Sequence, residues 1–159
     1  MRADGAIVAT APMPMPTTGR ILAIDWGEVR LGLALSDELQ ILASPLGTLV
    51  RRPGKRFPMP PFLEYIDRHH PVGLIVGLPL TLAGDEGPSA TAARELASLV
   101  ADRTTLPVEL IDERMTTARA HREIQAQGGS ARGRKEEVDA LAASVLLQGY
   151  LDMRRGGAT

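Results

Sequence analysis

Four carboxylates lie at the ends or on the apolar sides of hydrophobic segments, where packing alone would favour an apolar residue. Three follow apolar runs typical of buried strands, and the fourth shares a helical stripe with small and apolar side chains; they are Asp25, Asp112, Glu113 and Asp139. Burying a carboxylate costs free energy unless it is paired or bound to a cation, and converging carboxylates need positive charge between them. Taken singly, each acid is more often a cap, a turn residue or a salt-bridge partner. Taken together, they indicate a cation site.

The composition narrows the identity of the cation. The chain has no cysteine and only three histidines, and the spacing of these histidines does not form a metal site. The remaining ligands are oxygens, which favour Mg²⁺ or Mn²⁺. Two such ions can activate a water molecule and stabilise the leaving oxygen of a phosphodiester. The acids therefore favour hydrolysis of phosphodiesters by a metal-dependent enzyme.

Strand geometry separates two of the four acids. Successive side chains of a strand point to opposite faces, so Asp112 and Glu113 are expected on different sides of the sheet. They are therefore not expected to serve the same site. Alternation alone does not choose between them.

The elements that must position these acids are typical of a mixed α/β fold. Tight connections between the first apolar runs predict an antiparallel meander of three strands, and strands then alternate with helices. The pattern predicts a three-layer fold with a mixed five-stranded sheet, three antiparallel strands then two parallel, flanked by helices. The expected strands cover 21–25, 31–35, 40–49, 72–77 and 108–111, and the expected helices begin near 61, 88, 116 and 135.

The length of 159 residues suits one domain. Residues 1–19 are rich in Ala, Pro, Met and Thr, and their alternating prolines predict a disordered tail. The domain is expected to span 20–153, with a flexible C-terminal tail over 154–159. The segment 51–61 carries four basic residues among prolines and is expected to be a mobile basic loop.

Charge and hydropathy exclude several classes of protein. The formal net charge is −1, which excludes a polybasic nucleic-acid coat but leaves room for local basic patches. No apolar run reaches the ~20 residues that a membrane span requires, and no signal peptide is expected. The chain lacks a Gly-x-Ser-x-Gly elbow and a nucleotide P-loop. The absence of cysteine fits a reducing compartment, so a cytoplasmic location without membrane contact is expected.

Four blocks of the chain resemble the YqgF/RuvX family of Holliday junction resolvase-like proteins, which have an RNase H-like fold. The blocks occur in the family's order and cover nearly all of the chain outside the first 19 residues. They are DWGEVRLGLALSD (25–37), VGLPL (76–80) with Gly84, DERMTT (112–117), and KEEVDALAA (135–143) running to LQGYL (147–151).

The resemblance implies a metal-dependent nuclease with a two-metal Mg²⁺ or Mn²⁺ site. Family members are assigned to maturation of the 5′ end of pre-16S ribosomal RNA, and resolution of Holliday junctions is the alternative. The family's catalytic and metal-binding positions fall on Asp25, Glu113 and Asp139, which selects Glu113 over Asp112 and leaves Asp112 a structural role. Basic residues near these motifs are expected to contact phosphates: Arg30, Arg114, Arg132, Arg134 and Lys135.

One departure from the family pattern concerns the loop after Leu80. Family members commonly carry Asn and then Asp in this loop, whereas Thr81 and Ala83 occupy these positions here. The polar substrate contacts of that loop are therefore not expected in this chain.

Two alternatives come from other functional classes. Asp25-x-Gly27 followed by Gly32 also resembles the first phosphate loop of actin-like and Hsp70-like ATPases, but those proteins bind nucleotide between two such domains. A non-catalytic nucleic-acid-binding module would bind without turnover, and converging carboxylates argue against a mere phosphate-binding face. The expected partner is nucleic acid: pre-rRNA, or branched or single-stranded DNA. Resolution of a junction would require a symmetric homodimer.

Overall fold

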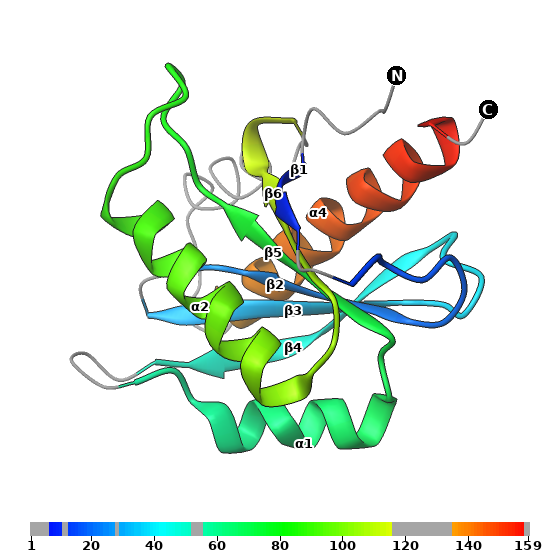
Figure 1. Ribbon diagram of the computed structural model, residues 1–159. Helices are drawn as coiled ribbons and strands as arrows, with labels where there is room; N and C mark the ends of the chain where they lie inside the picture. Colours follow the sequence, from blue (N-terminus) through cyan, green and yellow to red (C-terminus); the bar gives the residue numbers. More distant parts are fainter. Residues whose placement is uncertain (1–6, 11–12, 28, 52–55, 116–134, 158–159) are drawn as a thin grey trace.

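The computed structural model describes residues 7–10, 13–27, 29–51, 56–115 and 135–157. Six strands form one sheet in the order β1-β6-β5-β2-β3-β4. Helices α1 and α2 cover one face, and α4 crosses the other (Figure 1). The strands are β1 (Ile7–Thr10), β2 (Ile21–Asp25), β3 (Arg30–Ser36), β4 (Ala43–Val50), β5 (Gly73–Leu78) and β6 (Val108–Asp112). The helices are α1 (Met59–His69), α2 (Pro88–Thr104), the 3₁₀ turn η1 (Glu113–Met115) and α4 (Lys135–Gly157).

The expected three-layer α/β architecture is confirmed. β2, β3 and β4 pair antiparallel, and β2, β5 and β6 pair parallel. Every residue of β2 and β5 is buried, because helices cover both faces of these central strands and apolar side chains occupy both. Within the described ranges, none of the helices combines the length and the apolar character needed to cross a membrane.

The described residues of the first 19, 7–10 and 13–19, differ from the expected disordered tail. Ile7–Thr10 forms β1, which pairs antiparallel with β6 and adds a sixth strand to the five that the sequence predicts. This segment of four residues contains three β-branched side chains, which favour a strand. Farther along, Met15 is buried at 8% exposure and packs in the core on the α4 face.

The C-terminal residues also differ from the expected tail. α4 does not end at residue 153 but continues to Gly157. Its last turns are held by Arg154, which donates to Gln40 Oε1 at 2.9 Å and to the carbonyls of Pro16 and Met15 at 3.2 and 3.3 Å. The segment around Met15 and the end of α4 therefore stabilise each other.

Two elements that contain prolines differ in detail from the expected ones within the described part of the chain. In β4, Leu33 of β3 pairs with Gly47 and Ala34 pairs with Pro45, so one extra residue bulges next to the proline. α1 begins at Met59, ahead of Pro61, which makes the end of the expected basic loop helical. Residues 52–55 of that loop and the helix expected near 116 lie outside the described residues.

Two apolar clusters separate the faces of the sheet. On the α4 face, Ile21, Ala23, Ile75 and Ile111 pack beneath the helix, together with its own apolar side chains. On the other face, alternate residues of the same strands pack against α1 and α2. The alternation expected for buried strands is therefore present in β2, β5 and β6.

A buried polar contact anchors α4 within its apolar cluster. The Tyr150 hydroxyl donates to Glu109 Oε2 at 2.9 Å. Burial raises the pKa of Glu109, although the hydrogen bond from Tyr150 and the charge of Arg154 oppose this shift. Both side chains are buried, so the bond satisfies two groups that would otherwise lose hydration.

α4 approaches the sheet very closely at Gly32 of β3. A Cβ at this position would lie 1.9 Å from the backbone oxygen of Asp139, which is far inside contact distance. The backbone of α4 therefore rests directly on the backbone of β3, and any side chain at residue 32 would push the helix away.

We predict that Gly32→Ala lowers the free energy of unfolding by about 1–3 kcal/mol, the usual cost of overpacking a core. At this chain length, each kcal/mol lowers Tm by roughly 2–4 °C. Urea unfolding followed by circular dichroism measures the change. Gly156→Ala in the last turn of the same helix is the control, because a Cβ there meets no atom within 4 Å. Equal stability of the two variants would contradict the close packing of α4 on β3.

Candidate active site

Three residues on neighbouring strands form a row across one end of the sheet. Asp25 is the last residue of β2 and pairs with Gly32 of β3. On its other side, β2 and β5 run parallel with Ile24 beside Val76, so Gly77 follows as the neighbour of Asp25. Alternation along β2 places Asp25, at 3% exposure, on the α4 face. A carboxylate therefore lies between two glycines on the face that α4 covers.

Glu113 approaches this row from β6. It begins η1 directly after the strand and has 1% exposure. A Cβ on Gly77 would lie 2.6 Å from Glu113 Oε1 and 3.0 Å from Cδ2 of Leu146 in α4. The carboxylate of Glu113 thus occupies space above Gly77, on the same face as Asp25.

Asp139 approaches from α4, on the other side of Asp25. Its backbone lies over Gly32, as described above, and its carboxylate accepts a hydrogen bond from Arg30 Nε at 2.8 Å. Both side chains are partly exposed, at 24% for Arg30 and 21% for Asp139. The ion pair links the start of β3 to the second turn of α4 and neutralises one of the three acids.

The structure therefore gathers Asp25, Glu113 and Asp139 on one face and at one end of the sheet. In this arrangement, however, no three His, Cys, Asp or Glu side chains within the described ranges form a ready metal-binding group. In the same arrangement, one oxygen of Asp139 is engaged by the bond from Arg30.

Asp112 lies on the opposite face, as alternation predicts. The Arg114 side chain binds it with Nη2 to Oδ2 at 2.7 Å and Nε to both oxygens at 3.1 Å, and the Arg114 backbone N–H donates to Oδ1 at 2.9 Å. Burial alone would raise the pKa of Asp112, but these hydrogen bonds lower it below its usual value. Asp112 thus fixes the chain that follows β6, next to Glu113.

The basic residues expected to contact phosphates have different outcomes. Arg30 and Arg114 each pair with an acid, as described above, and Arg114 Nη1 also donates to the Leu82 carbonyl at 3.4 Å. Lys135 is the first residue of α4, but its side chain lies outside the described residues, as do Arg132 and Arg134.

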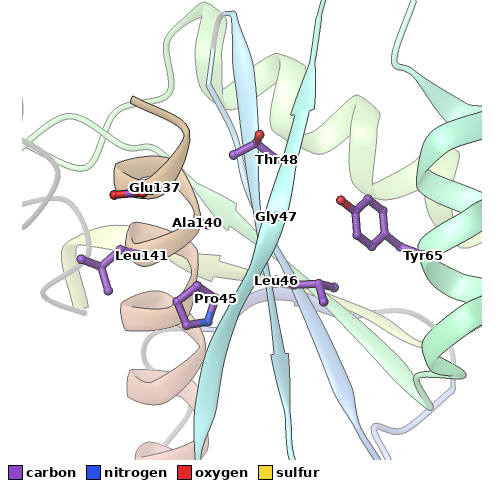
Figure 2. Close-up of a pocket in the computed structure, with 8 residues that line it drawn as sticks. All are labelled: Pro45, Leu46, Gly47, Thr48, Tyr65, Glu137, Ala140 and Leu141. Carbon is purple, nitrogen blue, oxygen red and sulfur yellow. The ribbon is translucent and has the colours of Figure 1, made fainter. Parts of the chain in front are cut away.

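A groove beside these acids carries a negative charge, which does not suit a phosphate. A cavity of about 580 Å³ opens along β4 between the first turns of α4 and Tyr65 of α1 (Figure 2). The charged residue among the described side chains that line it is Glu137, two positions before Asp139. Its negative charge disfavours a phosphate there.

The sequence did not predict that Gly32 and Gly77 make room for the acids, although both lie within its motifs. Gly32 and Gly77 each interrupt an apolar strand, at Leu31-Gly32-Leu33 and Val76-Gly77-Leu78. A glycine inside a strand signals close approach of another backbone or a ligand, so the signal was present.

Comparison with known proteins gives a consistent result. The family model described as "RuvX: Holliday junction resolvase" matches residues 19–153. A protein of Anaeromyxobacter dehalogenans strain 2CP-C named "Putative pre-16S rRNA nuclease" is 42% identical over 135 residues, which cover 85% of this chain and 98% of that protein. A relative of the same name from Koribacter versatilis is 40% identical over 141 residues, covering 89% of this chain and 92% of that protein.

Solved structures agree on the fold. The RuvC protein of Thermus thermophilus in complex with a Holliday junction substrate superposes with a TM-score of 0.56 at 19% identity, covering 87% of this chain and 97% of that one. A second structure of Thermus thermophilus RuvC gives 0.52 at 18%. These likenesses establish the RNase H-like fold. With the match of the family model over most of the chain and relatives at about 40% identity, they lead to one conclusion: this chain belongs to the RuvX family.

Proposed function

We propose that this protein is a metal-dependent nuclease that hydrolyses phosphodiester bonds during 5′-end processing of pre-16S rRNA. The observation that carries the proposal is the row in which Asp25 lies between Gly32 and Gly77, with Glu113 above one glycine and Asp139 above the other. The names of the 40–42% identical relatives support the RNA substrate. A precursor rRNA as substrate would place this activity in the cytoplasm.

The three acids gathered around the row suit a divalent metal. Their donors are carboxylate oxygens, which Mg²⁺ and Mn²⁺ prefer, and the two glycines keep side chains out of the space between them. Asp25, Glu113 and Asp139 would hold one or two such ions. When bound, the ions supply Lewis-acid activation of water and neutralise charge on the leaving oxygen.

Other side chains of the protein would bind the substrate and position the acids. Arg30 neutralises Asp139, and with a metal bound at the acids its guanidinium would be available to bind a phosphate oxygen beside them. Arg132, Arg134 and Lys135 precede Asp139 in sequence, so we propose that they bind the backbone of the substrate and set its register. Asp112 and Arg114 hold Glu113 in place.

We predict that Asp25→Asn abolishes cleavage of a pre-16S rRNA fragment, with a loss greater than about 100-fold, because even residues that only support a metal ligand cost 10–100-fold. The same variant should lose the rise in Tm that Mg²⁺ or Mn²⁺ gives the unmodified protein. Cleavage assays and thermal melts with metal or EDTA measure both effects, with single-stranded and four-way-junction DNA as competing substrates.

Glu137→Gln is the matched control for this experiment, since it removes a carboxylate two residues from Asp139 that faces the groove along β4. It should cleave and gain stability from metal as the unmodified protein does. Undiminished cleavage by Asp25→Asn would overturn the proposed site, and preferential cleavage of the four-way junction would overturn the proposed substrate.

We also predict that Arg30→Gln binds Mn²⁺ roughly 3- to 10-fold more tightly, because the metal no longer competes with the guanidinium for Asp139, and tenfold corresponds to 1.4 kcal/mol. Isothermal titration calorimetry without nucleic acid measures the affinity. Arg94→Gln is the control, as it breaks an ion pair with Glu86 at 2.6 Å, outside the site. An unchanged affinity of Arg30→Gln for Mn²⁺ would show that Arg30 does not compete with the metal for Asp139.

A further inference from the structure

A second cavity lies on the opposite face of the sheet, at the same end as the carboxylates. It has a volume of about 270 Å³. One side comes from the segments that follow β2 and β4, and the other from α2. The lining residues are Trp26, Arg51, Arg56, Phe57, Ala92, Glu95, Leu96 and Leu99.

The cavity is joined to the proposed active site through the backbone of β2. Asp25 faces α4, whereas Trp26, the next residue, packs in the cluster beneath α1 and α2. Their Cα atoms are therefore about 3.8 Å apart, yet their side chains serve opposite faces. A second connection runs through Arg51, whose backbone N–H donates to the carbonyl of Val29 at 2.7 Å, beside Arg30.

The position of Arg51 is fixed by an aromatic contact. Its guanidinium carbon lies 4.3 Å from the centroid of the Trp26 ring, within the range of a cation–π interaction. Trp26 itself is buried at 9% exposure, so it forms a firm support. The arginine is thereby held at the cavity at low entropic cost, and a planar group can stack on a guanidinium as it does on an aromatic ring.

The chemistry of the cavity matches a nucleobase better than a free anion. Arg51 and Arg56 attract phosphate, but Glu95 on α2 repels it, and much of the wall is apolar, with Phe57 and Leu96 prominent. A base presents an apolar face to such a wall and N–H donors to a carboxylate. Its flanking phosphates supply the negative charge that the two arginines require.

We propose that this cavity binds one unpaired nucleobase of the substrate strand, next to the bond that is cut. The proposal rests on the nuclease function proposed above. The strand passes over the end of β2, so that a phosphate reaches Asp25 on one face while the neighbouring base enters the cavity on the other. The protein therefore requires a nucleotide that is free of its duplex at this position, and the cavity contributes to selection of single-stranded sites.

The test uses Trp26, which is the one tryptophan in the sequence, so its fluorescence reports directly on the cavity. A short single-stranded oligoribonucleotide is titrated into the protein in EDTA, where no cleavage occurs. The emission of Trp26 should change as the oligoribonucleotide is added and should then reach a plateau. A duplex of the same sequence and inorganic phosphate should leave the emission unchanged.

Two variants locate the binding. Ala92→Leu fills the cavity from α2 with a residue that is also a good helix former. It should lower the affinity for the oligonucleotide roughly 5- to 100-fold, the range for loss of one stacked base. Arg56→Gln should lower the slope of log affinity against log salt by about one. Arg68→Gln is the control, because it removes the same charge from the last turn of α1, where it lines a different cavity together with Thr18 and Arg20.

The outcomes separate this proposal from the proposed function. Binding seen by anisotropy without any change in Trp26 emission would overturn the base pocket, and so would equal affinity of Ala92→Leu. Either result leaves metal-dependent cleavage standing. A saturable Trp26 signal in a protein that never cleaves would support the pocket and overturn the nuclease.

Discussion

The close contact between α4 and β3 is the constraint on which the site depends. Because Gly32 has no side chain, the backbone of Asp139 rests on the strand, and the helix brings its acid to the end of β2. Gly77 does the same for Glu113 on the other flank. Two missing side chains thus determine where two carboxylates lie relative to Asp25. The apolar contacts of α4 with β2, β3 and β4 hold this arrangement.

The cost of gathering negative charge explains the neighbouring cations. Carboxylates that converge near a core repel one another, which makes their charged forms less stable. Two nearby arginines offset this repulsion: Arg30 pairs with Asp139, and Arg114 pairs with Asp112. The first of these pairs engages one of the three acids gathered at the end of the sheet, and Arg30 supplies its counter-charge. The pair at Asp112 holds the backbone that follows β6.

Much of the fold was predictable because its central strands are continuous apolar runs and its helices have clear periodicity. It was also predictable that Asp112 and Glu113 lie on different faces of the sheet, since successive side chains of a strand alternate. The sequence did not reveal β1, because four residues ahead of a proline-rich stretch carry little pattern without their partner β6. It also did not reveal the bond between Arg30 and Asp139, which joins residues 109 positions apart. Such contacts depend on how α4 crosses the sheet, which no local pattern encodes.

The pairing of β1 with β6 has a consequence for how the chain folds. β1 leaves the ribosome long before β6, so Ile7 must wait for Ile111 before its backbone is paired. The bond from Arg154 to the Met15 carbonyl closes an even longer loop of 139 residues. Long loops make such contacts late and slow. The sheet edge at β1 therefore forms only after β6 has been synthesised, and until then the β-branched segment has no partner strand and its backbone groups are open to mispairing.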